Sequence, residues 1–466
     1  MASVNKRVVS RTSVTHEGGQ ADRVSNYDAL KRSVMSALLG EDTFYEDGQT
    51  IKERINELAK KVPAMKVAEL AVDAKEQGKL RHIPLWLAVG LARRPNEIKI
   101  APLLERIVTR PDEMGEFLSL MAQANGNEKR KPSGGVKFPK QVKLGLAAAF
   151  GKFNEYQLDK WKSPKDAIRP IDVLRLVHPK PANPEQAALW NRLKTGTLAS
   201  ARTWEQRSSA GEDQNEMWTD MLNAPRGKGL GYRALLMNLR NMKNAGVDPE
   251  LVASQLIPRA TKSWILPFQF IAARNAVPEW EEMIDLAMQN SVAGMPKLKG
   301  KTVFLVDNSG SMGGKMSGKS KMDRRDVACA MAILADGMCE ESVIYAFSDD
   351  LKFIKGNGKN KALHGFKLFD AIKNSNYGGT YLGKCVTKAL KENPDADRLI
   401  SITDEQSADK VPNPSIRGYM CNVAPNANGV GYYGNWTHVD GLSEYMFAFI
   451  SALENGVITS GEDEEE

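Results

Sequence analysis

The sequence predicts two structural classes in one chain, a long all-α part followed by an α/β domain. From Tyr27 to about Asn290, apolar residues recur at spacings of three and four, which is the period of amphipathic helices. There is hardly a convincing strand before Thr302. After Pro296 the pattern changes to short β-rich runs that alternate with helical ones, and this order is typical of a doubly wound α/β domain.

The helical part, residues 26–295, shows its period clearly at Ile51, Ile55, Leu58 and Val62. Prolines interrupt the pattern at intervals, and helix pairs recur at roughly 35 to 45 residues, a length typical of helical repeats. We expect an α-solenoid of HEAT-like type, in which each pair buries its apolar face against its neighbours. The repeats have no clear consensus, and an irregular helical bundle is the alternative.

The α/β domain is expected over residues 296–458. Preceding the helical part, residues 1–25 are polar and contain Gly18 and Gly19, so they predict a flexible arm. Residues 459–466 form an acidic tail whose composition favours disorder. The expected strands cover residues 302–307, 342–347, 398–404 and 416–423, and the expected helices cover 323–338, 363–374, 381–392 and 442–454.

Composition predicts a cytoplasmic protein. The 466 residues contain no apolar run of about 18, the length that a membrane span needs. The first residues lack the apolar core of a secretory signal. The four cysteines, Cys329, Cys339, Cys385 and Cys421, show neither C-x-x-C nor histidine spacing, so we expect reduced core thiols and no zinc site.

The net charge of +7 is unevenly distributed along the chain. From Lys297 onward there are 20 Lys and Arg against 23 Asp and Glu, which leaves 44 against 34 for the N-terminal part. The basic excess therefore belongs to the helical part. It is compatible with a polyanionic partner, although many solvated helical surfaces carry such an excess.

A candidate metal site follows the first expected strand. Asp307, Ser309 and Ser311 alternate in the loop after the apolar run that begins at Val303, so their oxygens can converge in a tight turn. Thr380 lies in a Gly-Gly-Thr loop before a helix, and Asp404 ends another apolar strand. Carboxylate and hydroxyl oxygens are ligands for a hard divalent cation such as Mg²⁺. Because the hydroxyls are neutral, the cation would keep enough charge to take an acidic group from another molecule.

These motifs carry a family resemblance. The five residues resemble the metal-ion-dependent adhesion site of von Willebrand factor A domains. The junction, from Trp264-Ile265-Leu266-Pro267-Phe268 through an amphipathic helix into Val303, resembles the TROVE module joined to such a domain in the Ro ribonucleoprotein family and its bacterial and phage relatives. Residues 235–242 and 173–181 fit the same family. The resemblance covers nearly the whole chain, about Tyr27 to Leu453.

The resemblance implies a fold and a function. The helical repeats would curve into a ring closed by the von Willebrand A domain. Family members bind small structured Y RNAs on the basic outer surface and single-stranded 3′ ends of misfolded or unprocessed RNAs in the central hole. Bacterial relatives work with a 3′ exoribonuclease such as polynucleotide phosphorylase. The chain would be a monomeric RNA-binding protein in RNA quality control or maturation, and not an enzyme.

The candidate RNA-binding residues form one main cluster with two additions upstream. Basic side chains can neutralise phosphates, and Trp161 and His178 offer faces for stacking on unpaired bases. The RNA-binding role that the resemblance implies can be assigned best to Lys165, Arg175 and His178. The main cluster is Lys160, Lys162, Lys165, Arg169, Arg175, His178 and Lys180, and the additions are Lys137 and Lys140 on a helix face and Lys129, Arg130 and Lys131 in a loop.

Other interpretations remain open for these residues. Trp161 is also compatible with a core position. His178 is also compatible with a residue that only ends a helix, and the lysine stripe that begins at Lys137 is also compatible with a solvated helix face. For the whole chain, the alternative is a protein-interaction adaptor that captures an acidic partner residue through the cation. A metal-dependent hydrolase is disfavoured because the site offers no evident general base beyond Asp404 and Glu405.

Overall fold

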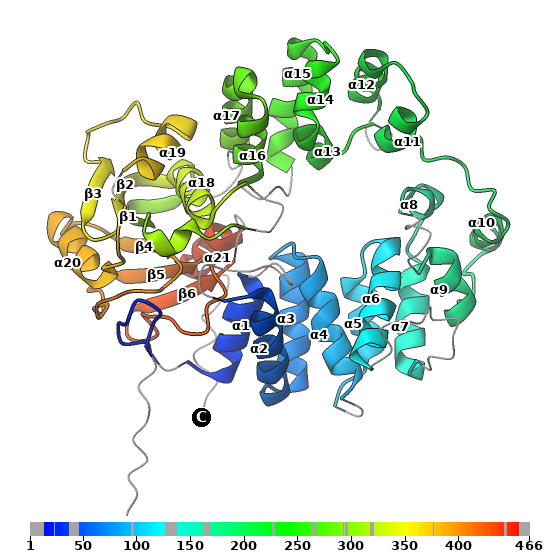
Figure 1. Cartoon of the computed structure of the whole chain (residues 1–466), viewed down its shortest axis with the longest axis horizontal. Helices are drawn as coiled ribbons and strands as arrows, with labels where there is room; N and C mark the ends of the chain where they lie inside the picture. The colour runs from blue at the N-terminus through cyan, green and yellow to red at the C-terminus, as the bar shows by residue number, and fades with distance from the viewer. Residues whose placement is uncertain are drawn as a thin grey trace, which may run out of the picture. The chain divides into compact units, whose positions relative to one another are not determined.

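The chain divides into two compact units (Figure 1). The helical unit comprises Lys52–Ile265 and Ala273–Ala287, and the α/β unit comprises Met1–Ile51, Leu266–Ala272 and Met288–Glu466. The computed structural model describes residues 14–22, 24–36, 46–94, 97–125, 138–161, 168–225, 229–262, 265, 268–291, 293, 297–316, 321–375, 377–441 and 445–455.

Helices with short connections make up the helical unit, and α2, α16 and α17 cross its boundary. In chain order the helices are α2 (Gly48–Lys61), α3 (Ala64–Glu76), α4 (His82–Ala92), α5 (Ile100–Ile107), α6 (Pro111–Ala124), α7 (Lys140–Phe150), α8 (Glu155–Lys160), α9 (Pro170–Val177), α10 (Pro184–Thr195), α11 (Trp204–Ser209), α12 (Gln214–Asn223), α13 (Tyr232–Met237), α14 (Leu239–Asn244), α15 (Pro249–Arg259), the 3₁₀ helices η2 (Ala260–Lys262) and η3 (Pro278–Trp280), and α16 (Phe268–Ala276) and α17 (Glu281–Asn290).

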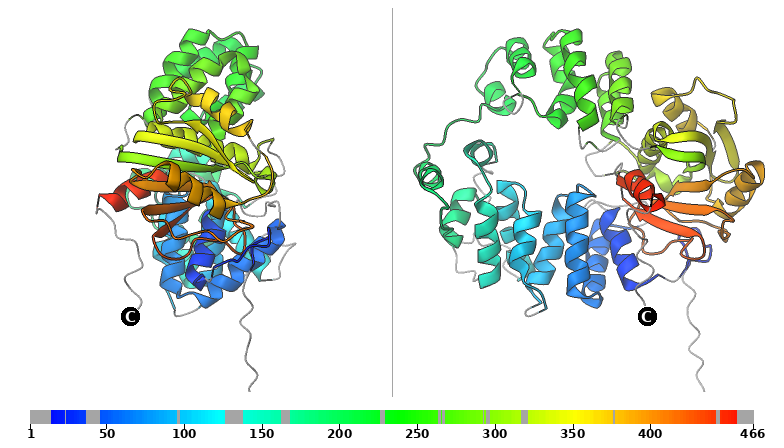
Figure 2. Two further views of the ribbon diagram at one scale, coloured as in Figure 1. Left: turned by 90° about the vertical axis from the view of Figure 1, so that its left-hand side faces the viewer. Right: turned by 180° about the vertical axis from the view of Figure 1, so that it is seen from behind.

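Each helix of the first half packs against helices close to it in sequence. α3 contacts α4 and α5, α4 contacts α6, and α5 contacts α7, which in turn contacts α9 (Figures 1 and 2). Gly145 permits the close crossing of α5 and α7, because a Cβ there would lie 2.8 Å from the Cα of Ala101. Such nearest-neighbour packing is what a helical-repeat array predicts.

A sheet with the strand order β3-β2-β1-β4-β5-β6 forms the centre of the α/β unit. All neighbouring strands are parallel except β2 and β3, which are antiparallel. Between the strands come η4 (Gly310–Gly313), α18 (Arg324–Gly337), α19 (Gly365–Lys373) and α20 (Leu382–Glu392), with α21 (Tyr445–Glu454) last. The strands are β1 (Leu298–Asp307), β2 (Cys339–Phe347), β3 (Leu351–Lys355), β4 (Arg398–Thr403), β5 (Arg417–Asn422) and β6 (Trp436–Asp440).

Helices cover the two faces of this sheet. Val303 and Leu305 of β1 share one core cluster with Leu382 and Val386 of α20. Alternate residues of a strand point to opposite faces, so Phe304 faces the other side of the sheet, and α18 packs against β1, β2 and β4. The doubly wound α/β expectation is thus confirmed. The sequence analysis omitted β3 and β6, which are five residues each and lie at the two edges of the sheet.

The N-terminal residues differ from their expected role. Residues 14–22, predicted as part of a flexible arm, are hydrogen-bonded to the α/β unit, and Thr15 is 3% exposed. α1 (Asn26–Met35) follows and contacts β6, with Leu30 and Val34 fully buried. The prediction that the helical part begins at residue 26 was therefore wrong for this helix. Its apolar face packs in the α/β unit, and its buried Arg32 finds its hydrogen-bond partners there.

Two expectations about cysteines and membranes can be compared with the structure. All four cysteines are free and buried, which confirms the expected core thiols. Among the described residues, no helix has both the length and the apolar character that crossing a bilayer requires.

Candidate metal centre and basic surface

Four of the five residues predicted as metal ligands, Asp307, Ser309, Ser311 and Asp404, lie at the carboxyl ends of β1 and β4, and Thr380 lies in the loop before α20. These strands are parallel neighbours with Val306 opposite Ile402, so the residues that follow them meet at one edge of the sheet. All five side chains are buried, with relative exposures between 0 and 2%. The structure therefore brings Asp307, Ser309, Ser311 and Asp404 to one buried edge of the sheet, and cation binding there stays a prediction.

Hydrogen bonds fix the first strand end. Asp307 accepts the backbone N–H of Ser309 at 2.9 Å on one carboxylate oxygen and the hydroxyl of Thr403 at 2.6 Å on the other. The hydroxyls of Ser309 and Ser311 lie 3.0 Å apart. Gly310 donates its N–H to the carbonyl of Gly378 at 2.9 Å, which joins this loop to the one that carries Thr380.

Burial and mutual repulsion perturb the two carboxylates. Burial, with a further contribution from Asp404, raises the pKa of Asp307 to about 7. Burial likewise raises the pKa of Asp404 to about 6, against the opposing effect of a hydrogen bond from the N–H of Gln406. Two buried acids whose ionised forms destabilise each other are a suitable place for a divalent cation, because its charge offsets both.

Thr380 provides an independent indication of a missing ligand. Its hydroxyl oxygen is buried and has no hydrogen-bond partner among the described residues. Buried hydroxyls normally have a partner, and a cation can supply the missing interaction. The described residues contain no cluster of three or more His, Cys, Asp or Glu side chains that could hold a metal, so a cation here would depend on hydroxyl oxygens. The five residues fit Mg²⁺ on these grounds.

The basic residues of the helical unit gather around two helix ends. Lys160 ends α8, with its ammonium nitrogen 4.9 Å from the ring centroid of Trp161 and 5.4 Å from that of Tyr156. The guanidinium of Arg110 lies 5.0 Å from the Trp161 ring. Trp161 is half-buried and Tyr156 is 37% exposed, so each ring is partly buried and partly accessible to solvent.

The other predicted RNA-binding residues have different surroundings. Arg169 pairs with Asp172 at 3.1 Å, so part of its charge is already neutralised. Arg175 and Lys180 are exposed near the end of α9, and Lys140 is exposed at the start of α7. Lys129, Arg130, Lys131, Lys137, Lys162 and Lys165 lie outside the described residues.

Comparisons with known proteins find similarity to a family model and to a solved structure. Residues 183–334 match the family model described as the TROVE domain. This part of the chain is similar to the TROVE domain. Among solved structures, the chain is similar to the Ro (RSR) protein of Deinococcus radiodurans, with a TM-score of 0.58 and 16% identity over 93% of this chain and 100% of that one. No curated protein sequence matches it significantly.

The sequence analysis missed three residues near these sites. Thr403 bonds Asp307 because of the strand register, which a motif does not show. Arg110 directly precedes Pro111, and the sequence does not show that it lies beside an aromatic ring. Tyr156 has no periodic neighbour that would distinguish it from a core residue.

His178 ends α9 in the left-handed conformation, with φ of 45° and ψ of 58°, and its side chain is exposed. For residues with a Cβ this conformation costs about 1 kcal/mol or more, whereas glycine adopts it freely. We expect His178→Gly to raise the free energy of unfolding of the protein by about 0.5 to 1 kcal/mol in urea denaturation. His178→Ala should give no such gain.

The same variant separates the two interpretations of His178. If the imidazole stacks on RNA, His178→Gly binds RNA more weakly although it is more stable. If the residue only ends the helix, RNA affinity stays at the wild-type value.

Cation binding by this chain should depend on pH. The pKa values of Asp307 and Asp404 lie above their ordinary value of 3.8, so the cation-free folded protein binds more protons than the unfolded chain between about pH 4 and 7. Its free energy of unfolding therefore falls as pH rises through this window, and Mg²⁺ should offset the loss. We expect Mg²⁺ to raise the Tm clearly at pH 8 and only slightly at pH 5. Equal increases at both pH values would contradict this.

Proposed function

We propose that this chain binds small RNAs, both structured Y-like RNAs and RNAs with single-stranded 3′ ends, and aids their quality control or maturation. The observation that supports this most strongly is the cation–aromatic cluster of Arg110, Tyr156, Lys160 and Trp161, which lies within one compact unit. Aromatic faces flanked by cations are the combination that binds single-stranded nucleic acid, because bases stack while phosphates are neutralised.

Acidic side chains near Arg110 could neutralise the positive charge that RNA binding needs. Asp112 accepts from Arg110 at 2.7 Å and from Arg81 at the same distance, and Arg81 also lies 3.6 Å from Glu116. Two arginines thus face the two carboxylates of Asp112 and Glu116, and the additional positive charge beside Trp161 comes from Lys160, 4.9 Å from the ring centroid. Arg175 and Lys180 add exposed positive charge at the end of α9.

Half-exposed rings favour unpaired bases. Bases within an A-form duplex are stacked on each other, so an aromatic side chain reaches them only at ends, loops and bulges. Structured RNA would instead be held through its phosphates by the exposed basic residues. Closure of the helical repeats into a ring with 3′ ends in its hole, action as a cytoplasmic monomer, and partnership with a 3′ exoribonuclease such as polynucleotide phosphorylase belong to this proposal through the family resemblance.

We further propose that the α/β unit is a von Willebrand A-like domain whose Asp307, Ser309, Ser311, Thr380 and Asp404 hold Mg²⁺. The unpartnered Thr380 hydroxyl and the two buried carboxylates support this. The cation would supply an electrophilic centre that can accept a carboxylate from a partner. An adaptor function through this capture is the second candidate, and it does not exclude RNA binding.

Purification without added nuclease tests the RNA proposal directly. The full chain is isolated from a cell lysate in moderate salt, and any bound RNA is sequenced at its 3′ end. Recovery of structured small RNAs, or of RNAs with ragged single-stranded 3′ ends, would support the proposal. A wild-type chain that carries no RNA but still binds Mg²⁺ would favour the adaptor.

A further inference from the structure

The loop of residues 404–408 connects two of the proposed cation ligands. Asp404 opens the loop and accepts the N–H of Gln406 at 3.1 Å on its carboxylate. At the far side, the carbonyl of Thr380 accepts the N–H of Ala408 at 2.7 Å and the hydroxyl of Ser407 at 3.4 Å. The position of this loop therefore determines where the Asp404 and Thr380 oxygens lie relative to Asp307.

The loop is strained and needs support. Glu405 has a φ of 60°, in the left-handed region that residues with a Cβ rarely adopt. Its carboxylate is fully buried. Strained positions of this kind persist only when the surrounding structure holds them. Much of that support comes from the N-terminal clamp, which we define as residues 14–22 and 24–36.

The first contact of the N-terminal clamp is made by a tight turn. Thr15 donates its hydroxyl to the carbonyl of Ser407 at 2.7 Å, and the N–H of His16 donates to the side-chain oxygen of Gln406 at 2.8 Å. Gly19 allows the close approach, because a Cβ there would lie 2.2 Å from the Ser407 oxygen. The turn is thus fitted to the backbone of the loop.

The second contact is a buried arginine on α1. Arg32 is fully buried and donates to the carboxylate of Glu405 at 2.5 Å, to the hydroxyl of Tyr432 at 3.1 Å and to the carbonyl of Asp404 at 3.4 Å. His438 contacts the other oxygen of Glu405 at 3.0 Å. A buried carboxylate requires such partners, so removal of Arg32 would leave Glu405, next to a cation ligand, with His438 alone as its side-chain partner among the described residues.

A third contact joins the clamp to the loop of residues 426–432. Asp22 accepts the N–H groups of Gly431 at 2.6 Å and of Tyr432 at 3.0 Å, and its own N–H donates to the carbonyl of Gly429 at 3.0 Å. Asn426 in this same loop donates to the carbonyl of Asp404 at 3.3 Å. Two loops that meet at Asp404 are therefore both held by the N-terminal residues.

From these contacts we propose that the N-terminal clamp positions the 404–408 loop for the cation, with Arg32 and Thr15 as positioning residues, so that docking of the clamp and cation binding favour each other. This inference rests on the proposed cation site. Such coupling is reciprocal: if the docked clamp increases cation affinity, the bound cation stabilises the docked clamp by the same factor.

Calorimetric titration of the full chain with Mg²⁺ tests the first half of this coupling. We expect Thr15→Val, which keeps the shape but removes one hydrogen bond, and Arg32→Met to weaken Mg²⁺ binding by about tenfold or more. Ser36→Ala is the matched control, since this buried hydroxyl on the same segment donates to the carbonyl of Asn422 at 3.0 Å and does not touch the loop. Its affinity should stay within about twofold of wild type.

Hydrogen exchange of the backbone amides tests the second half and does not require a destabilised variant. Saturating Mg²⁺ should slow exchange at residues 15–22 in the wild-type chain and leave it unchanged in Asp307→Asn. Wild-type affinity in folded Thr15→Val together with Mg²⁺-independent exchange would overturn the clamp but leave the cation site standing. A wild-type chain that binds no Mg²⁺ would overturn both, and neither result depends on RNA.

Discussion

Asp307→Asn is expected to weaken Mg²⁺ binding at least about a hundredfold, which corresponds to about 2.7 kcal/mol. The side chain keeps its size, but the site loses one of its two carboxylates, and the remaining ligands are neutral hydroxyls and Asp404. Calorimetric titration with Mg²⁺ at pH 8 measures the change.

The same variant should have the opposite effect on the cation-free protein. Removal of one charge relieves the repulsion between Asp307 and Asp404 that contributes to the raised pKa of Asp307. The Tm without Mg²⁺ at pH 8 should therefore stay the same or increase. A decrease in both cation affinity and cation-free stability would instead indicate that Asp307 is mainly structural.

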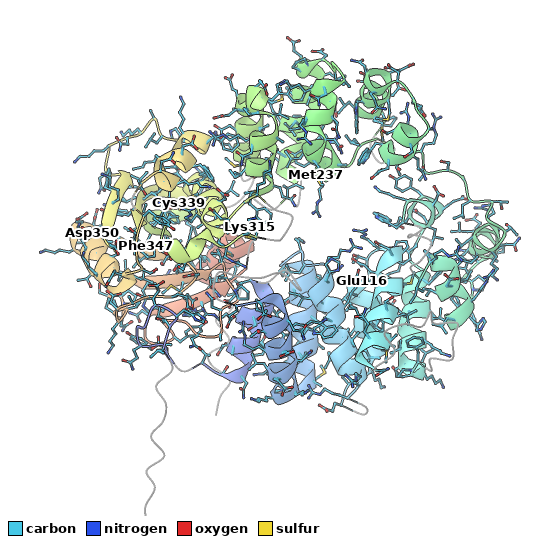
Figure 3. The ribbon with its side chains drawn as sticks, viewed as in Figure 1. Glu116, Met237, Lys315, Cys339, Phe347 and Asp350 are labelled. Atoms are coloured by element: carbon cyan, nitrogen blue, oxygen red, sulfur yellow. The ribbon has the colours of Figure 1, made fainter. Side chains whose placement is uncertain are left out.

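Asp350 provides the matched control for this substitution. It follows β2 in the same unit, just beyond Phe347, and its side chain is 56% exposed (Figure 3). Asp350→Asn removes the same charge and should leave Mg²⁺ affinity within about twofold of wild type. If both variants bind Mg²⁺ equally well, the predicted site is not where the cation binds.

Charge reversal on the helical unit should produce the second large effect. In the triple variant Lys160→Glu, Arg175→Glu and Lys180→Glu, the removal of each ion pair with a phosphate is expected to cost about 1 kcal/mol, so the affinity for single-stranded RNA should fall about a hundredfold. The plot of log affinity against log salt should become shallower by about 0.7 for each phosphate that the variant no longer neutralises. Fluorescence anisotropy at several salt concentrations measures both quantities.

A second triple variant controls for net charge. Lys361, Lys367 and Lys391 are exposed on the α/β unit, and their reversal to Glu changes the net charge by the same amount. This control should bind RNA with nearly the wild-type affinity and keep the salt dependence of the wild type. Equal decreases in affinity in both triple variants would show that RNA responds only to overall charge, and the proposed cluster would have no specific role.

The proximity of the proposed cation ligands Asp307 and Asp404 could be predicted from sequence because each one is marked locally. Asp307 and Asp404 end apolar runs, and the carboxyl ends of parallel strands meet at one edge of a sheet, so pattern alone brings them together. The hydrogen bond from Thr403 to Asp307 depends on strand register, and the sequence does not show the register. The meeting of these two carboxylates was therefore predictable, whereas the hydrogen bond that supports Asp307 was not.

The role of the N-terminal residues could not be predicted for a different reason. Thr15 and Ser407 are separated by 392 positions, and Thr15 and Asp22 bond backbone groups, which have the same chemistry in every residue. Polar composition and glycines are common to flexible arms and to turns that dock by hydrogen bonds. Arg32 likewise occupies a polar position of an amphipathic helix, and only the buried Glu405 shows why it is there.

For Trp161, both interpretations of the sequence, a core position and a stacking surface, are partly right. A core position and a stacking surface seemed exclusive, yet the ring is half-buried and has cations near its face. An amphipathic side chain at the end of a short helix can pack with one part and expose another. Sequence periodicity does not resolve this, because α8 has only six residues.

RNA binding by the helical unit is tested most directly by comparing two labelled hairpins that differ only in a short single-stranded 3′ tail. Each is titrated with the wild-type chain at fixed salt, and anisotropy gives its affinity. We expect the tailed hairpin to bind more tightly, and Trp161→Ala to remove most of that difference while the blunt hairpin is little affected. Equal affinity for both hairpins, or a difference that Trp161→Ala leaves intact, would contradict the proposed role of this cluster in binding unpaired RNA.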